Sequence, residues 1–333
     1  MIVARLHGRG DVRVHEEPPP TFGADQALVR VTGVGLCGSD LHWYEDASIG
    51  ATPLAAPLVL GHEIVGIVAS GPRAGQRVVV DPADACETCR LCLAGRPELC
   101  PSMRFAGHAP TDGGLRELMA WPERLLVPLP DAVTERGAAA LETLAVALHA
   151  VELTDVRPGD RARVAVVGSG PIGLLVVAAL RATGIDDVVA TDRLPHRVER
   201  ARDLGARAAW RSDDAPTDLE ADVVIECAGT DDGVAAAVAA AAPGGRVVLV
   251  GIPASDATTF RASIARRKGL ALVHCRRSAP RHLAAAVDLA ARRAVDLDLV
   301  VSDVIPLDAS PAAFAALAAR RGHKIVVAAA VAA

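Results

Sequence analysis

The sequence predicts an α/β fold in which a β-rich domain is joined to a doubly wound parallel sheet of the Rossmann type. Two observations support this prediction. Residues 1–133 are rich in glycine and proline and contain short runs of alternating apolar and polar residues, the pattern of half-buried strands joined by turns. From Arg161 onward, short apolar strands alternate with helical stretches, which is the pattern of βαβ units.

Length, composition and charge narrow the class of protein. The chain has 333 residues, enough for two domains, and 51% of them are hydrophobic, so a large core can be buried. The formal net charge is −5 and no basic block stands out, which argues against a nucleic-acid partner. The apolar stretch 172–180 is too short to span a bilayer and residues 1–14 do not resemble a secretory signal. We therefore expect a cytoplasmic protein with no membrane partner.

Periodicity places the elements of the β-rich part and of a linking helix. Residues 1–14 are predicted to form a strand pair, and a helix is predicted over residues 135–153, where Ala, Leu and Val recur at helical spacing. Further strands are predicted over residues 27–34, 64–68 and 77–80.

The second part is predicted to alternate between strands and helices. Its strands are expected over residues 163–167, 187–192, 221–226, 246–251 and 269–274. Its helices are expected over residues 174–183, 195–204 and 234–242. The last segment, residues 280–333, is predicted to add two helices and two strands.

Four closely spaced cysteines form the most specific motif. The spacing Cys86-x2-Cys89-x2-Cys92-x7-Cys100 suits a tetrahedral zinc site, and a site filled by four thiolates is structural, not catalytic. Two disulfides or four unrelated cysteines are the alternatives, but clustered thiols without an export signal more often bind metal.

A glycine-rich turn follows the first strand of the second part. The run Gly168-Ser-Gly170-Pro171-Ile172-Gly173 lies between a predicted strand and a predicted helix, which is the context of a dinucleotide-binding loop. Gly168 permits the tight turn, Gly170 lets backbone amides approach a pyrophosphate, and Gly173 allows close packing of helix on strand. The alternative is a tight turn without a ligand.

The end of the next predicted strand bears on the choice of cofactor. A carboxylate at Asp192 can accept hydrogen bonds from the adenosine ribose and repel a 2′-phosphate, which favours NAD over NADP. Arg193 and Arg197 follow closely, and two guanidinium groups could hold a 2′-phosphate, so NADP stays open. Arg197 could also be a solvated charge on the helix.

A third set of polar residues lies in the β-rich part. Cys37 is followed by Ser39, Asp40 and His42, and a Gly61-His62-Glu63 run comes later. Cysteine, histidine and carboxylate are zinc ligands, although each of these residues alone would be unremarkable.

Taken together, these motifs resemble the zinc-containing medium-chain dehydrogenase family over essentially the whole chain. Residues 35–42 and 60–63 resemble its catalytic-zinc segment, and residues 86–100 have its structural-zinc spacing. Residues 140–149, with residues 100–105 and 112–114, resemble the sorbitol (polyol) dehydrogenase branch and in it most closely L-idonate 5-dehydrogenases. The branch usually has proline after the helix glutamate, where this chain has Thr143.

The resemblance implies roles for individual residues. Cys37, His62 and Glu63 would hold a catalytic zinc, and Glu142 would be a fourth ligand or hold a zinc-bound water. Ser39 and His42 fall where the family places its proton-relay groups. One zinc would be catalytic and one structural. Arg276 or Arg277 could contact the substrate, and Arg104 could bind a substrate carboxylate or form a structural ion pair.

The resemblance also implies an architecture and an activity. Residues 1–145 would form a GroES-like catalytic domain, residues 146–275 the Rossmann domain, and residues 276–333 would return to the catalytic domain. The expected activity is NAD(P)-dependent oxidation of a secondary alcohol in a polyol or sugar acid, with L-idonate as the first candidate, by a homodimer or homotetramer. The alternatives are a sorbitol, xylitol, threonine, glucose or simple alcohol dehydrogenase, a zinc-free quinone reductase, or a non-catalytic regulator that binds zinc and a nucleotide.

Overall fold

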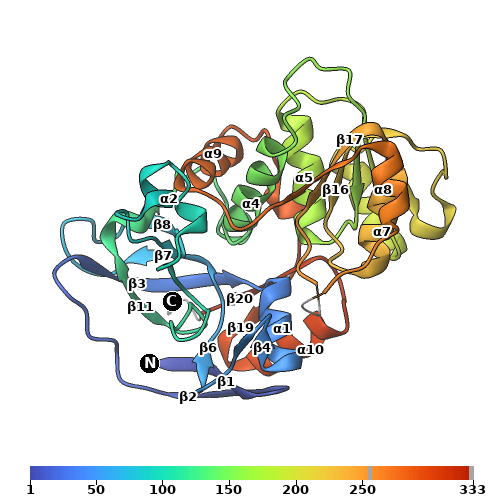
Figure 1. The fold of residues 1–333 in the computed structure, drawn as a ribbon. Coiled ribbons are helices and arrows are strands. Elements are labelled where there is room, and N and C mark those ends of the chain that lie inside the picture. The colour runs from blue at the N-terminus through green and yellow to red at the C-terminus, as the bar shows by residue number, and fades with distance from the viewer. Residues whose placement is uncertain (254–256, 330–333) are drawn as a thin grey trace. The chain divides into compact units, whose positions relative to one another are not determined.

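The computed structural model describes residues 1–253 and 257–329, which form two compact units. Unit 1 contains residues 1–142, 279–292 and 301–329 of the described chain, and unit 2 contains residues 143–278 and 293–300. The β-strands of the two units belong to separate sheets (Figure 1). Each unit also has its own apolar core.

Unit 1 is built on a seven-stranded sheet. Its strands run in the order β12-β8-β7-β3-β20-β19, and β11 also pairs with β3. A smaller sheet has the order β2-β1-β6. The strands of the larger sheet are β3 (Gln26–Gly35), β7 (Glu63–Val68), β8 (Arg77–Val80), β11 (Leu118–Pro122), β12 (Leu126–Pro128), β19 (Val301–Pro306) and β20 (Lys324–Ala328). Those of the smaller are β1 (Ile2–Gly8), β2 (Asp11–Glu16) and β6 (Leu58–Val59).

The C-terminal segment completes the sheet that the N-terminal segment begins. Strand β20 pairs antiparallel with β3, so that Val326 lies opposite Gly35, and the backbone N–H of Leu36 donates to the Ile325 carbonyl at 2.9 Å. The tail also supplies helix α10 (Ser310–Ala318), whose Phe314 is fully buried in the unit 1 core. The return of the tail brings residues from both ends of the chain into one core.

Unit 2 contains a six-stranded, wholly parallel sheet in the order β15-β14-β13-β16-β17-β18. Strand order reverses between β13 and β16, the switch point at which doubly wound sheets bind ligands. This confirms the predicted doubly wound parallel sheet. The strands are β13 (Val164–Val167), β14 (Val188–Asp192), β15 (Ala208–Arg211), β16 (Ala221–Glu226), β17 (Ala241–Leu249) and β18 (Ala271–His274). The helices include α5 (Pro171–Ala182), α6 (Pro195–Asp203), α7 (Asp231–Ala240) and α8 (Ala262–Lys268).

Two predicted helices differ from the structure. The helix expected over residues 135–153 is divided into α3 (Glu135–Ala138) and α4 (Leu141–Glu152), and α3 contains Gly137, a poor helix former. The helix expected over residues 234–242 ends at Ala240, and β17 begins at Ala241 because pairing with β16 outweighs the helix propensity of alanine. Within residues 1–253 and 257–329, every helix is too short or too polar to cross a membrane.

Candidate metal and cofactor sites

Cys37 lies at the start of a short helix in unit 1. It is the N-cap of α1 (Gly38–Asp46), and its backbone N–H donates to Oδ2 of Asp40 at 2.9 Å. The other carboxylate oxygen of Asp40 accepts the backbone N–H of Gly61 at 3.1 Å. Asp40 therefore ties the segment that carries Cys37 to the segment that carries His62.

His62 and Glu63 are delivered where β7 begins. Gly61 has a φ of +87°, and this left-handed turn sets the direction in which the next two side chains leave the backbone. Glu63 lies opposite Gly35 on β3, where a Cβ atom would come within 2.1 Å of Glu63 Oε2. A side chain at position 35 would therefore displace the Glu63 carboxylate.

The structure brings Cys37, His62 and Glu63 together. One donor atom from each residue lies within 4.8 Å of the other two, and His62 and Glu63 are buried. Thiolate, imidazole and carboxylate are the donors that catalytic zinc sites combine, with a further position left for substrate or water. The donor set and its burial fit a zinc ion.

The surroundings of His62 are strongly anionic. Burial alone would lower the pKa of His62, but the carboxylate of Asp40, whose Oδ1 lies 3.7 Å from Nδ1, and the sulfur of Cys37 outweigh it and raise that pKa to about 10. The same surroundings attract a metal cation. The Phe105 ring packs beside that of His62, with the two ring centroids 5.4 Å apart.

Lys324 contacts the candidate metal site, and sequence reasoning missed it. It is the first residue of β20, is 1% exposed, and its Nζ donates to both carboxylate oxygens of Glu63, at 2.6 and 2.7 Å, and to the Leu36 carbonyl at 3.1 Å. No local motif marks it, because the pairing of β20 with β3 places it there.

Glu142 lies in the first turn of α4 and is 7% exposed. Burial, with the like charges of Glu63 and Asp81, raises the pKa of Glu142 to about 7, while His62 and Lys324 oppose that rise. Among the described residues, the compact donor group contains Cys37, His62 and Glu63 without Glu142. Glu142 is thus an electrostatic neighbour of the group, close enough to interact with two of its members.

Ser39 and His42 share one face of α1, three residues apart. Both are half-buried, and His42 Nδ1 lies 3.7 Å from Asp46 Oδ2. Both lie on the helix that begins immediately after Cys37.

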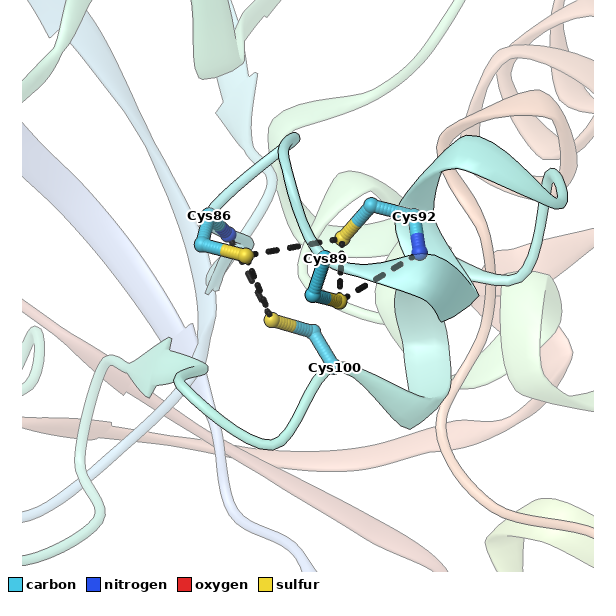
Figure 2. Close-up of side chains that lie close together, drawn as sticks. All are labelled: Cys86, Cys89, Cys92 and Cys100. Atoms are coloured by element: carbon cyan, nitrogen blue, oxygen red, sulfur yellow. Dashed lines mark hydrogen bonds between the residues drawn. The ribbon is translucent and has the colours of Figure 1, made fainter.

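The segment 86–100, called the cysteine lobe below, carries Cys86, Cys89, Cys92 and Cys100, whose sulfurs converge as Figure 2 shows. Sulfur–sulfur distances are 3.5 Å for Cys89–Cys92 and for Cys86–Cys100, and 4.0 Å for Cys86–Cys92. A tetrahedron with Zn–S bonds of about 2.3 Å has edges of about 3.8 Å, whereas a disulfide would bring sulfurs to about 2.05 Å. All four thiols are free, so the geometry fits zinc and excludes the disulfide alternative. Backbone N–H groups of Thr88 and Cys89 lower the pKa of Cys86 to about 6, which favours the thiolate that zinc binds.

The glycine-rich turn in unit 2 joins β13 to α5. Gly168 has a φ of +92°, and a Cβ atom there would lie 2.7 Å from the Ala228 nitrogen. At Gly173 a Cβ atom would lie 1.9 Å from the Gly168 carbonyl oxygen. Gly170 is the N-cap of α5, Pro171 and Ile172 begin the helix, and a Cβ on Gly170 would meet no atom closer than Arg197 Nη1 at 3.5 Å. Protein packing therefore requires glycine at 168 and 173, while position 170 leaves space at the positive end of α5, as a pyrophosphate needs.

Asp192 ends β14 beside this turn. Its Oδ2 accepts the Ser169 backbone N–H at 2.8 Å, and its Oδ1 accepts that of Leu194 at 2.8 Å. Arg197 is not a solvated charge, since its side chain is 14% exposed and its Nη1 lies 3.8 Å from Asp192 Oδ2. Arg193 is exposed.

Three further arginines were candidates for substrate contacts. Arg104 donates to the Asp84 carboxylate at 2.9 Å and lies 5.7 Å from the Trp121 ring centroid, so it forms a structural ion pair. Arg276 is exposed, and the Arg277 carbonyl accepts a hydrogen bond from His149 Nδ1 at 2.8 Å.

Comparison with known proteins gives family matches to both parts of the chain. Residues 23–131 match the alcohol dehydrogenase GroES-like domain, and residues 171–292 match the zinc-binding dehydrogenase family. Sorbitol dehydrogenase of Bacillus subtilis is 33% identical over 77% of this chain and 76% of its own length. Sorbitol dehydrogenase 1 of Saccharomyces cerevisiae is 35% identical over 80% of each chain.

Solved structures extend the similarity to nearly the whole chain. L-Idonate 5-dehydrogenase of Escherichia coli K-12 superposes with a TM-score of 0.91 at 27% identity, covering 98% of this chain and 97% of that one. An alcohol dehydrogenase of E. coli CFT073 complexed with NADH gives 0.89 at 25% identity, covering 98% and 99%. A protein of Sinorhizobium meliloti 1021 bound to NADP gives 0.87 at 29% identity, covering 98% of each chain.

These matches confirm the predicted GroES-like and Rossmann architecture and the predicted enzyme class. The convergent Cys37, His62 and Glu63 and the four-cysteine lobe supply the metal-binding groups that this class needs. The chain belongs to the family of zinc-binding, NAD(P)-dependent medium-chain alcohol dehydrogenases.

Proposed function

We propose that this chain oxidises a secondary alcohol of a polyol or sugar acid, with NAD as hydride acceptor and L-idonate oxidation at C5 as the first candidate reaction. The observation that carries the proposal is the convergence of Cys37, His62 and Glu63 within 4.8 Å. The names of its relatives, two sorbitol dehydrogenases and an L-idonate 5-dehydrogenase, support this substrate class.

In this proposal Cys37, His62 and Glu63 hold the catalytic zinc, and Glu142 is a fourth ligand or holds a water beside it. Zinc bound there supplies a Lewis acid that lowers the pKa of a substrate hydroxyl. Asp40 orients His62 and fixes the Cys37 backbone through the contacts described above. Cys86, Cys89, Cys92 and Cys100 hold the structural zinc.

The hydroxyl proton leaves along α1. Ser39 lies two residues after Cys37 and can accept a proton through its hydroxyl while donating its own. His42 lies one turn further along the same face, where its imidazole can accept that proton and pass it to solvent. A nicotinamide bound in unit 2 would accept the hydride and supply the redox chemistry.

The cofactor binds at the turn between β13 and α5. The space left at Gly170 and the N-terminus of α5 receive the pyrophosphate, and Gly168, Pro171, Ile172 and Gly173 shape the turn. Asp192 accepts hydrogen bonds from the adenosine ribose and makes NAD the preferred cofactor. Arg193 and Arg197 follow Asp192 closely in the chain, and their guanidinium groups allow weaker binding of NADP through its 2′-phosphate.

The proposal assigns residues 1–145 and 276–333 to the catalytic domain and residues 146–275 to the dinucleotide-binding domain. A homodimer or homotetramer is the proposed assembly, by analogy with the family. Because Arg104 is held by Asp84, the carboxylate of a sugar acid is not assigned to it.

The experiment that tests this function is a substrate panel followed by NADH or NADPH absorbance. L-Idonate, gluconate, sorbitol, xylitol and threonine are each offered with NAD and with NADP, using zinc-loaded enzyme. We expect turnover of at least one polyol or sugar acid and higher kcat/KM with NAD. Turnover of threonine alone, or turnover that is unchanged in zinc-free protein, would contradict the proposal.

A further inference from the structure

Glu63 takes part in two interactions that draw on the same carboxylate. It belongs to the compact donor group with Cys37 and His62, and both of its oxygens accept from Lys324 Nζ, at 2.6 and 2.7 Å. A carboxylate has about four lone-pair sites, so an ammonium ion and a metal can bind it together. Each cation then weakens the attraction of the carboxylate for the other.

The position of Lys324 is specified by the fold on all sides. The pairing of β20 with β3 fixes the backbone of Lys324. Its Nζ also donates a hydrogen bond to the Leu36 carbonyl at 3.1 Å. Glycine at position 35 leaves the space that the Glu63 carboxylate fills. With Glu63 and Lys324 each 1% exposed, water does not screen the pair.

The cation that contacts Glu63 is a lysine, although arginine is the usual cationic residue of this chain. The chain uses arginine for nearly all its cationic side chains and has two lysines, Lys268 and Lys324. An ammonium group is compact enough to contact both Glu63 oxygens and a carbonyl from one point, whereas a guanidinium is planar and extended. A compact point charge suits a cation that must leave room for a metal on the same carboxylate.

We propose that Lys324 is a positioning residue that competes with the catalytic metal for Glu63 and thereby keeps Glu63 a weak zinc ligand. This inference rests on the proposed function, since it takes Cys37, His62 and Glu63 as the zinc site. Lys324 holds the carboxylate in place when the metal is weakly engaged and limits how much negative charge the carboxylate offers to the metal.

The alternative is an ion pair that serves folding alone, and the two roles predict different couplings to zinc. If Lys324 competes with zinc, replacing it by methionine leaves a buried carboxylate that binds zinc more tightly, and zinc then stabilises the fold more than in the wild type. If the pair serves folding alone, Lys324→Met lowers stability by the same amount with and without zinc.

The test is a chelator titration of the zinc-loaded enzyme with metal analysis, repeated as thermal unfolding with and without the labile zinc. For Lys324→Met we expect about tenfold tighter retention of the catalytic zinc and a larger zinc-induced rise in Tm than in the wild type, together with lower kcat. Unchanged or weaker zinc retention with an unchanged zinc-induced rise in Tm overturns the inference.

Three variants control the experiment. Lys268→Met makes the same substitution at a lysine whose Nζ donates to the Ala239 and Ala241 carbonyls in unit 2, and should leave zinc retention unchanged. Lys324→Arg keeps a cation at the site and should bind zinc less tightly than Lys324→Met. If Lys324→Met does not fold, Lys324→Gln keeps a hydrogen-bond donor beside Glu63 without the positive charge, and it should retain zinc more tightly than the wild type; retention equal to the wild type contradicts the inference.

A fourth variant separates this inference from the proposed function. Cys37→Ser should reduce the zinc content from two ions per chain to one. If Cys37→Ser keeps both ions, the proposed zinc site is wrong and the inference falls with it. If Cys37→Ser loses one ion while Lys324→Met behaves as the wild type toward zinc, the site stands and the competition by Lys324 is wrong.

Discussion

The backbone N–H of Ser169 donates to Oδ2 of Asp192 at 2.8 Å, joining the glycine-rich turn to the end of the neighbouring strand. The second oxygen of Asp192 accepts the Leu194 N–H, also at 2.8 Å. Asp192 thus orders the turn, and in the proposed function the same carboxylate also contacts the adenosine ribose. A substitution of Asp192 can change both the order of the turn and the cofactor preference. The choice of variant decides which of these two effects is measured.

Asp192→Asn should change cofactor preference with little loss of order. Asparagine removes the negative charge that repels a 2′-phosphate but keeps an oxygen for one backbone N–H, while Arg193 and Arg197 remain. We expect the ratio of kcat/KM for NADP to that for NAD to rise about tenfold, or about 1.4 kcal/mol. Asp192→Ala should shift the ratio in the same direction and also lower Tm. An unchanged ratio in both variants would show that Asp192 does not select the cofactor.

Cys37→Ser should abolish turnover without affecting NADH binding. Serine is a much poorer zinc ligand than a thiolate, and the Lewis acid contributes several kcal/mol, so kcat should fall at least about a hundredfold. The cofactor turn lies in unit 2, so the NADH dissociation constant, read from fluorescence, should stay within about twofold. Wild-type turnover in this variant would refute the assignment of Cys37.

Asp40→Asn should weaken the catalytic zinc site. Asp40 is fully buried, accepts the backbone N–H groups of Cys37 and Gly61, and lies 3.7 Å from His62 Nδ1. Loss of a carboxylate behind a metal-binding histidine typically reduces metal affinity about 10- to 100-fold. Competition with a chromophoric chelator measures this effect. Asp46→Asn, at an exposed residue on the same helix, serves as the control and should bind zinc as the wild type does.

Cys92→Ser should destabilise the lobe without removing the catalytic zinc. Its sulfur lies 3.5 Å from that of Cys89 and 4.0 Å from that of Cys86, so the serine leaves a structural site with three thiolates. We expect the structural zinc to be lost and Tm to fall by about 5 °C or more. Cys275→Ser changes a half-buried thiol outside the lobe and should keep both ions. Retention of both ions by Cys92→Ser would argue against a zinc-binding lobe.

Asp81→Asn should stabilise the protein above pH 7. Burial, helped by the like charge of Asp84, raises the pKa of Asp81 to about 6, while the Ala83 N–H and Arg124 oppose that rise. Because the folded state binds this proton more tightly than the unfolded state, Asp81 lowers stability progressively as pH rises from about 4 to about 6.

Asparagine keeps an oxygen for the Ala83 N–H and carries no charge to desolvate. The variant should therefore gain up to about 3 kcal/mol at pH 8 and nothing near pH 4, from about two pKa units at about 1.4 kcal/mol each. Urea unfolding at the two pH values measures the difference. A gain of equal size at both would refute this origin.

Local patterns predicted most of unit 2. The strand expected over residues 221–226 is β16 (Ala221–Glu226), and the glycine-rich turn lies between a strand and a helix as expected, because alternation and turn chemistry are encoded within a few residues. The boundary at Ala241 was wrong because an alanine-rich run favours helix locally, and only pairing with a neighbouring strand overrides it.

The donor residues of the candidate metal site could be predicted from the sequence, but the residues that hold them in place could not. Cys37, His62 and Glu63 belong to recognisable motifs, and the structure brings their donor atoms together. Lys324 lies in no such motif, and Asp40, although part of the Cys37–His42 run, was given no role there. Lys324 reaches Glu63 through pairing between strands from opposite ends of the chain, and Asp40 acts through two backbone N–H groups. Contacts of this kind depend on the completed fold and produce no characteristic spacing of residues in the sequence.

In the proposed function Cys37, His62 and Glu63 bind one zinc ion. Anomalous diffraction from crystals of the zinc-loaded protein, collected on both sides of the zinc absorption edge, tests it most directly. We expect two zinc peaks per chain, one within bonding distance of Cys37 Sγ, a His62 ring nitrogen and a Glu63 oxygen, and one among the four lobe sulfurs. A peak at the lobe with none beside Cys37 would contradict it.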